Sequence, residues 1–227
     1  IEHGRQVLDP ARRREPTSYY GVTSGIGRVL RALPPERPAR VGLVGLGAGT
    51  LATYGRAGDS YRIYEIDPQV FTLARSEFRF LADSAARIEE VAGDARLAME
   101  REAPQRYDVL AIDAFSGGSV PVHLMTGEAM RVYLRHLRPD GVLAFHLTNR
   151  HLDLPPVVVE IARVQGLASM LVHDDAEGSD LRRTDWLLVA RDPARLAPFA
   201  RWSRPANRYT GARPWSDDFN NLLSILK

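Results

Sequence analysis

The chain has 227 residues, of which 44% are hydrophobic, 26% charged and 8% aromatic, and its formal net charge is +2. This length suits one large domain, or one domain with a small appendage, and the composition excludes collagen-like, coiled-coil and disordered chains. Cysteine is absent, which excludes disulfides, metal–thiolate sites and a cysteine nucleophile. Lys227 is the only lysine and the arginines are scattered apart from residues 12–14, so we expect no nucleic acid among the partners.

Strand-like and helix-like patterns alternate from about residue 40 onward. Short apolar runs predict strands over 41–44, 61–66, 87–91, 107–112, 142–147, 168–172 and 186–190. Helical spacing predicts helices over 70–81, 95–102, 126–137 and 157–164, with Asp67 and Thr126 as N-caps. Pro139-Asp140-Gly141 predicts a turn. This alternation predicts an α/β fold with a Rossmann-like, doubly wound and mostly parallel sheet.

The first 35 residues depart from this alternation. We predict a small N-terminal β segment around residues 6–8, an arginine-rich turn, and a lead-in helix over 24–33. The expected organisation is an N-terminal β segment over 1–22 and a Rossmann-like nucleoside-binding catalytic domain over 23–227. No stretch approaches the roughly 18 apolar residues that span a bilayer. Since the chain begins at Ile1 rather than Met, we expect a trimmed form or a segment of a longer protein.

A glycine-rich turn, residues 45–50, directly follows the first core strand. Gly45, Gly47 and Gly49 allow a tight turn and a close approach to a ligand, in a G-x-G-x-G spacing that differs from the G-x-G-x-x-G of nicotinamide binders. Glu65 ends the next strand, about 20 residues later, where a carboxylate can accept hydrogen bonds from both ribose hydroxyls of a nucleoside. The alternatives are a plain tight turn and a solvated strand-end glutamate.

Two aspartates follow the next strands. Asp94 stands between Gly93 and Ala95, where it can accept a hydrogen bond from an adenine amino group or cap the following helix, and both roles are compatible. Asp113 ends the fourth strand, at the carboxyl edge where open α/β sheets bind ligands. Together with the glycine turn and Glu65, these residues predict an adenosine–sulfonium site of the S-adenosylmethionine-dependent methyltransferase type.

With these motifs in order, the sequence resembles the spermidine synthase (polyamine aminopropyltransferase) family, and especially its domains of the transporter-fused type. The resemblance covers nearly the whole chain and is carried by residues 3–6, 16–21, 45–50, 64–67, 93–96, 113–116 and 215–219. It implies decarboxylated S-adenosylmethionine as cosubstrate, a small-molecule amine such as a diamine as acceptor, and no metal. It further implies a cytoplasmic homodimer, with any membrane segment outside this chain.

The resemblance assigns roles residue by residue. Gln6 is similar to the family's N-terminal glutamine that contacts the cosubstrate, Glu65 to its ribose-binding acid and Asp94 to its adenine-side aspartate. Asp113 resembles the first aspartate of its D-x-x-D gate segment, the proposed base. Tyr19 or Tyr20 stands where the family has an active-site tyrosine. The implied cosubstrate site consists of Gln6, Gly45, Gly47, Gly49, Glu65, Asp94 and Ala95.

Three contacts to an amine depart from the family pattern. Ala48 replaces the aspartate that holds the aminopropyl ammonium, Ser116 replaces the second gate aspartate, and Tyr20-Gly21-Val22 replaces a Tyr-His-Glu stretch. The loss at Ala48 favours a second hypothesis, a methyltransferase that uses intact S-adenosylmethionine. A third hypothesis is a non-catalytic nucleoside-binding domain.

The chemistry gives Asp113 its predicted role. A sulfonium is an activated leaving group, so the protein needs mainly to hold an amine in line with the carbon beside sulfur. The amine must be neutral to attack, although a free alkylamine titrates near ~10. Asp113 is the candidate base, with a tyrosine hydroxyl as orienting partner, and the alternative is ligand positioning without proton transfer.

Other polar residues leave their roles open. His146 lies in a buried strand, as a satisfied core histidine or as a site residue. Asp217 and Asp218 either supply negative charge for an amine or cap the last turns. We predict no metal site, because four histidines share no metal-ligand spacing on one element: His123, His136, His146 and His151.

Overall fold

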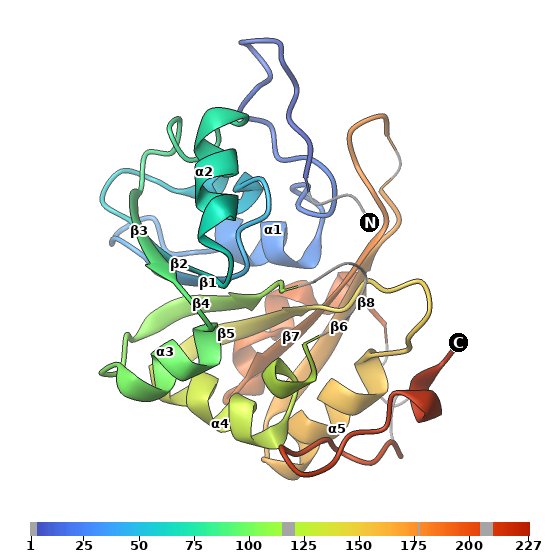
Figure 1. The fold of residues 1–227 in the computed structure, drawn as a ribbon. Helices are drawn as coiled ribbons and strands as arrows, with labels where there is room; N and C mark the ends of the chain where they lie inside the picture. Colours follow the sequence, from blue (N-terminus) through green and yellow to red (C-terminus); the bar gives the residue numbers. More distant parts are fainter. Residues whose placement is uncertain (1–3, 115–120, 177, 205–210) are drawn as a thin grey trace.

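The computed structural model describes residues 4–114, 121–176, 178–204 and 211–227. In these ranges the chain forms one eight-stranded sheet with helices on both faces (Figure 1). The strand order is β3-β2-β1-β4-β5-β7-β6-β8, and neighbouring strands from β3 to β5 are parallel. Strands β7, β6 and β8 each run antiparallel to their neighbours. The predicted doubly wound, mostly parallel α/β sheet is confirmed.

The elements lie close to their predicted positions. The strands are β1 Arg40–Val44, β2 Ser60–Glu65, β3 Arg87–Ala92, β4 Tyr107–Ile112, β5 Leu137–His146, β6 Ala168–Asp174, β7 Thr184–Ala190 and β8 Ser203–Arg204. The α-helices are α1 Gly25–Arg31, α2 Pro68–Ser76, α3 Ala95–Arg101, α4 Gly127–His136 and α5 Pro155–Val164. Short 3₁₀ turns are η1 Thr50–Tyr54, η2 Val122–Leu124, η3 Pro193–Arg195, η4 Ala197–Trp202 and η6 Leu223–Ile225. Both predicted N-caps are confirmed, since Asp67 accepts from the Gln69 amide and Thr126 from the Ala129 amide.

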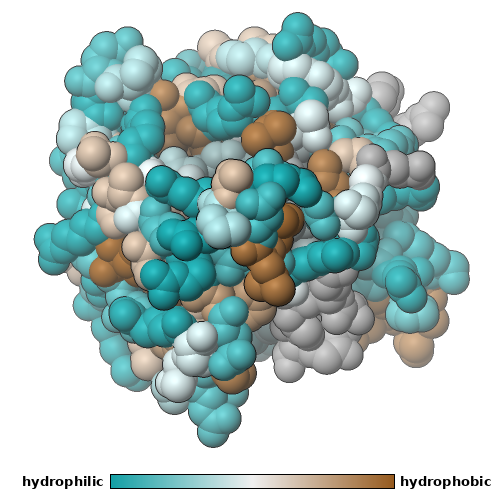
Figure 2. Space-filling view, turned by 90° about the horizontal axis from the view of Figure 1, so that it is seen from above, coloured by the Kyte–Doolittle hydropathy of each residue, from teal (hydrophilic) through white to brown (hydrophobic). Residues whose placement is uncertain are grey.

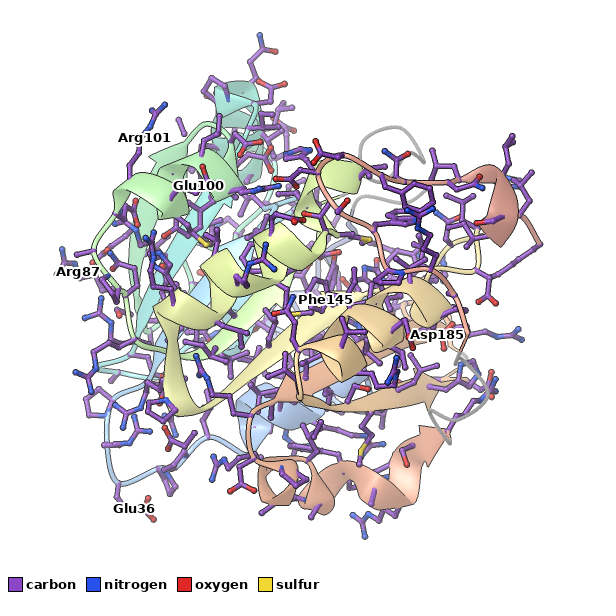
Figure 3. The ribbon with its side chains drawn as sticks, turned by 90° about the horizontal axis from the view of Figure 1, so that it is seen from below. Glu36, Arg87, Glu100, Arg101, Phe145 and Asp185 are labelled. Atoms are coloured by element: carbon purple, nitrogen blue, oxygen red, sulfur yellow. The ribbon has the colours of Figure 1, made fainter. Side chains whose placement is uncertain are left out.

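Two apolar cores flank the sheet. Helices α1 and α2 cover the upper face and helices α3, α4 and α5 the lower face (Figure 1). Figure 3 views the molecule from the lower side, with Phe145 inside the helix layer and Glu36, Arg87 and Glu100 at the periphery. Phe145 is only 1% exposed and belongs to the core beneath the sheet. Packing on both faces explains the continuous apolar runs 41–44 in β1 and 109–112 in β4.

The N-terminal strand predicted over residues 6–8 is wrong. Residues 4–22 form turns, and their one pairing in the described chain is an isolated bridge from Ser18 to Leu181. This bridge ties the segment to the tip of the β6–β7 hairpin, which rises beside it in Figure 1. Pro10 and Pro16 lack an amide proton, which disfavours a continuous ladder here. The domain boundary between residues 22 and 23 stays a prediction.

The turn predicted at 139–141 is also wrong, because β5 runs through it. Tyr107 pairs with Leu137 while Val109 pairs with Val142, so Asp108 alone faces the stretch 138–141. The extra residues form a bulge instead of ending the strand. Proline fits there because a bulge removes the need for regular ladder bonds.

The lengths of the helices and the hydropathy of one face can be described directly. Throughout the described ranges, no helix combines the length and apolarity that crossing a membrane requires. The face in Figure 2 is mostly hydrophilic, with scattered small apolar groups. A face of this kind lacks the continuous apolar patch that marks a large docking surface.

Asp59 supports the amino-edge start of β1 and β2, and its removal should weaken the fold in a pH-dependent way. This side chain is 2% exposed and accepts hydrogen bonds from the Ala39 amide at 2.7 Å and the Arg56 amide at 3.0 Å. Burial acts to raise the pKa of Asp59, but the hydrogen bonds from Arg56 and Ala39 leave this pKa below its ordinary value. Asp59 therefore stabilises the fold above the unfolded-state pKa, and this stability disappears as the pH falls through the folded-state value.

We expect Asp59→Asn to lower the free energy of unfolding by about 1–3 kcal/mol at about pH 7. The difference from the wild type should shrink below about pH 4, where the native carboxylate is protonated. Urea unfolding across this range measures both quantities. A difference that stays constant with pH would contradict the role of the Asp59 charge.

Candidate functional site

The glycine turn after β1 packs against the end of β4. Gly45, Gly47 and Gly49 have φ angles of 91°, 54° and 83°, in the left-handed region that favours glycine. A Cβ atom at Gly45 would lie 2.5 Å from the carbonyl oxygen of Asp113. Glycine is therefore required at residue 45, and its backbone lies directly beside the predicted base.

Glu65 braces this turn from the end of β2. One carboxylate oxygen accepts from the Leu46 amide at 2.9 Å, and the other accepts from the Asp67 amide at 3.1 Å. The side chain is 9% exposed, so it is not the solvated glutamate of the alternative interpretation. Each oxygen keeps a further lone pair, which leaves capacity for ribose hydroxyls. The ribose contact itself stays a prediction.

Asp94 caps α3 and also binds a histidine. Its Oδ1 accepts from the Leu97 amide at 2.9 Å, and its Oδ2 lies 2.7 Å from Nε2 of His123. Partial burial acts to raise the pKa of Asp94, but these hydrogen bonds leave it below its ordinary value. Ala95 begins the helix and is 5% exposed. The capping interpretation is confirmed, whereas the adenine contact stays a prediction.

Asp113 lies at the centre of a buried hydrogen-bond chain. Its amide donates to the Val44 carbonyl at 2.8 Å, which continues the β1–β4 ladder one residue beyond β4. Its Oδ2 accepts from the Tyr20 hydroxyl at 2.7 Å, and its Oδ1 lies 2.6 Å from Nδ1 of His146. The Asp113 side chain is 10% exposed. Two partners at normal hydrogen-bond distance thus compensate a nearly buried carboxylate.

The two candidate tyrosines have different contacts. Tyr20 brings its hydroxyl to Asp113, and the Tyr20 carbonyl accepts from the Tyr54 hydroxyl at 2.6 Å. Burial, together with the nearby Asp113 charge, raises the pKa of Tyr20 well above its ordinary value, so Tyr20 keeps its proton and donates a hydrogen bond to Asp113. The Tyr19 ring lies 5.2 Å, centroid to centroid, from the imidazole of His146.

His146 is a buried histidine with hydrogen-bond partners at both ring nitrogens, one of them Asp113, so the core interpretation is confirmed and a site role stays a prediction. It is 3% exposed and stacks on Trp186 at 4.7 Å with an interplanar angle of 10°. Its Nε2 lies 2.8 Å from the hydroxyl of Thr148 and 3.2 Å from that of Thr184. The sequence gives little indication of this contact, because a histidine at the end of one buried strand does not reveal that Asp113, after β4, lies beside it.

The side chain of Gln6 makes hydrogen bonds within the chain, and the nearby Gly4 lies against the glycine turn. The Gln6 amide group donates to the Arg13 carbonyl and accepts from the Arg79 amide, both at 2.8 Å. A Cβ atom at Gly4 would lie 2.3 Å from the Cβ of Ala48, so the two backbones are in close contact. The contact between Gln6 and a cosubstrate stays a prediction.

Asp217 does not gather with the other carboxylates. It accepts hydrogen bonds from Arg96 at 2.7 Å and from the Thr126 hydroxyl at 2.8 Å. The Arg96 hydrogen bonds lower the pKa of Asp217, and the guanidinium compensates its charge, a contact that neither predicted role of Asp217 included. Ser116 lies outside the described residues, as does His3.

Two other features bear on the kind of site. In the ranges that the structure describes, no group of three or more His, Asp or Glu side chains could hold a metal ion. A cavity of about 130 Å³ lies at the opposite, amino edge of the sheet, where Arg37, Asp108 and Phe199 are among its lining residues. It includes none of the predicted site residues.

Comparison with known proteins gives sequence matches to two kinds of transferase, whereas no family model matches. Over 107 residues the chain is 33% identical to the N-terminal histidine N-methyltransferase of Emericella nidulans, a match that covers 46% of the chain and 19% of that relative. Over 112 residues the chain is 36% identical to the polyamine aminopropyltransferase of Vibrio vulnificus (strain CMCP6). This match covers 47% of the chain and 37% of that relative, so the chain aligns with well under half of its length. The chain is thus spermidine-synthase-like in sequence, as the motifs predict.

Solved structures establish the fold. A probable spermidine synthase from Corynebacterium glutamicum ATCC 13032 has a TM-score of 0.61 at 20% identity, covering 86% of this chain and 78% of the other. Human methyltransferase-like protein 13, in complex with SAH, has a TM-score of 0.56 at 22% identity, covering 83% and 89%. The Rossmann-like fold of S-adenosylmethionine-dependent methyltransferases is confirmed, and the matched proteins are transferases.

Gly45→Ala tests the contact between the glycine turn and Asp113. A non-glycine residue in the left-handed region costs about 1–2 kcal/mol, and the added methyl would also collide with the Asp113 carbonyl. We expect Gly45→Ala to lower the free energy of unfolding, measured by chemical denaturation, by more than this range. The variant should also bind methylthioadenosine more weakly.

Gly58→Ala is the matched control. Gly58 has a φ of 90°, but its added Cβ would meet only Pro38, at 3.4 Å. Gly58→Ala should lose only the stability that the left-handed backbone conformation costs a non-glycine residue, and it should still bind methylthioadenosine. Equal losses in the two variants would mean that the approach to Asp113 has no special importance.

Proposed function

We propose that this spermidine-synthase-like domain transfers an aminopropyl group from decarboxylated S-adenosylmethionine to a small-molecule amine. The observation that carries the proposal is the contact between the Gly45 backbone and Asp113, whose carboxylate also binds Tyr20. A candidate base and a candidate nucleoside-binding turn therefore lie side by side at the carboxyl edge of the sheet. Alkyl transfer from a sulfonium to an amine needs this pairing.

The nucleoside half of the proposed site has suitable groups with free surface. Glu65 ends β2 and Asp94 follows the neighbouring strand β3, so both carboxylates lie at one edge. Ile66, next to Glu65, is 68% exposed, and Leu97 in the first turn of α3 is 50% exposed. A Cβ at Gly93 would meet nothing within 4 Å. Carboxylates with adjacent exposed apolar side chains suit a ribose and a flat base.

The proposed chemistry uses Asp113 as the base. When bound, the sulfonium cosubstrate supplies an activated carbon and a neutral thioether leaving group. Asp113 takes a proton from the ammonium of the acceptor, and the freed nitrogen lone pair forms the new bond to carbon as the carbon–sulfur bond breaks. Tyr20 keeps its proton and holds the carboxylate by donating to Oδ2.

The tail end of the proposed site supports a second candidate function, methyl transfer from intact S-adenosylmethionine. Ala48 offers no charge to an aminopropyl ammonium, and Gly4 lies against its methyl group. A cosubstrate that brings its own carboxylate has less need of an acidic residue here. Asp113 would serve as base in either reaction, so the two candidates differ in the tail they bind. A nucleoside-binding domain without catalysis is the third candidate.

The assembly and location of the protein remain part of the proposal. By resemblance we infer a homodimer in the cytoplasm, with any membrane segment outside this chain. Light scattering on the purified domain tests the dimer directly.

Ligand preference separates the three functions. We expect decarboxylated S-adenosylmethionine and methylthioadenosine to bind more tightly than S-adenosylhomocysteine, because the aminopropyl reaction involves no amino-acid tail. Isothermal calorimetry with the three compounds measures this order. A preference for S-adenosylhomocysteine would replace the proposal with methyl transfer. If none of the three compounds binds, both reactions are ruled out.

Asp113→Asn tests the base. The amide keeps the shape of the side chain but accepts no proton, so aminopropyl transfer to a polyamine should fall by about 10²–10⁴-fold. Mass spectrometry of the alkylated amine follows turnover, and calorimetry checks that methylthioadenosine still binds. A loss below about tenfold with intact binding would reduce Asp113 to a positioning role.

A further inference from the structure

We propose that His146 is a positioning residue for Asp113, and that its Nδ1–H holds this carboxylate in one orientation. The inference rests on the proposed function, because it gives His146 a task only where Asp113 acts as a base. It concerns a residue for which the sequence motifs supply no role.

The proposed role of Asp113 determines which of its partners must donate. A base accepts a proton, so its carboxylate only accepts hydrogen bonds and both of its partners must donate. Tyr20 donates to Oδ2 at 2.7 Å, and the atom 2.6 Å from Oδ1 is Nδ1 of His146. The imidazole proton therefore lies on Nδ1, between the two side chains.

The far side of the ring agrees with this assignment. The Asp185 amide donates to the Thr148 hydroxyl oxygen at 2.9 Å, which leaves the hydroxyl proton of Thr148 to point elsewhere. Nε2 of His146 lies 2.8 Å from that oxygen and is a suitable acceptor for the proton. A ring with its proton on Nδ1 thus has a partner at both nitrogens.

Packing holds the ring in place. Trp186 stacks on one side at 4.7 Å with an interplanar angle of 10°, and Tyr19 lies 5.2 Å away at 50°. With 4% of its side chain exposed, His146 has little freedom to rotate. A ring fixed in this way can orient Asp113 more firmly than a mobile donor can.

The surroundings contain a small set of titratable groups. Tyr19 and Tyr20 face the His146 ring from the N-terminal segment, and Asp113 faces it from the residue after β4. Beyond Thr148, Nδ1 of His173 on β6 lies 2.6 Å from Oδ1 of Asp185 on β7. A variant of His146 without the Nδ1 donor should favour the ionised form of the carboxylate less than the wild type does. The acidic limb of the kcat/KM profile would then move to higher pH.

Three variants test the assignment. His146→Phe keeps a ring against Trp186 but removes the donor, and His146→Asn can place an amide N–H where Nδ1 lies. His136→Phe is the control, since His136 is a fully buried histidine whose Nε2 faces the Met99 carbonyl, away from Asp113. We expect His146→Phe to lower turnover about tenfold or more and to move the acidic limb to higher pH. His146→Asn should restore much of both, and His136→Phe should leave the profile unmoved.

Two results overturn the inference: an unshifted profile in His146→Phe, or an Asn variant no better than the Phe variant. If His146→Phe fails to fold, His146→Gln takes its place, because its longer side chain moves the amide away from the Nδ1 position.

A measurement independent of activity separates this inference from the proposed function. The nitrogen chemical shifts of His146, assigned by comparison with His146→Asn, should report a neutral ring protonated on Nδ1 near neutral pH. Protonation on Nε2 alone would overturn the positioning role even in an active enzyme. If no amine is alkylated in any assay, the proposed function fails, and the chemical shifts still decide whether His146 donates to Asp113.

Discussion

The parallel pairing of β1 with β4 is the constraint on which the site depends. Its register sets Val44 opposite Ile112, and the ladder ends with the Asp113 amide donating to the Val44 carbonyl. The next residue of each strand is then Gly45 on one side and Asp113 on the other. A slip by one residue would turn every side chain of the strand to the opposite face and separate the turn from the carboxylate. The geometry of the candidate site at this edge is therefore a consequence of core packing in the sheet.

The same constraint explains why so much could be predicted from the sequence. Strand ends such as Glu65, Asp94 and Asp113 are visible as polar residues after apolar runs, and parallel topology brings such ends to one edge. Gly45, Gly47 and Gly49 carry their own conformational signature, which the positive φ angles confirm. These signals are local, so residue order alone conveys them.

The contacts that could not be predicted join distant parts of the chain. Tyr20 and Asp113 are 93 positions apart, and only the family resemblance indicated a tyrosine beside Asp113, without choosing between Tyr19 and Tyr20. His146, a further 33 positions on, had no such indication. No periodicity encodes such pairs, since each depends on where an irregular segment lies. The segment 4–22 shows this well: its turns replace a predicted strand, yet its fixed position against Leu181 is what brings Tyr20 to the carboxylate.

The energetics of Asp113 join the fold to the chemistry. Burial of an unpaired carboxylate is unfavourable, and removing one partner of a buried charged pair destabilises by several kcal/mol, about 3–5 in measured cases. Tyr20 and His146 offset this penalty only because Trp186 and the N-terminal segment hold them in place. In contrast, Gly4 and Ala48 meet with no room for a larger side chain at residue 4 and no charge at residue 48. Under the proposed function, the acceptor nitrogen meets the carboxylate of Asp113, whereas Ala48 offers no charge to the tail of the cosubstrate. In that proposal, selection among amines depends mainly on fit around the Asp113 carboxylate.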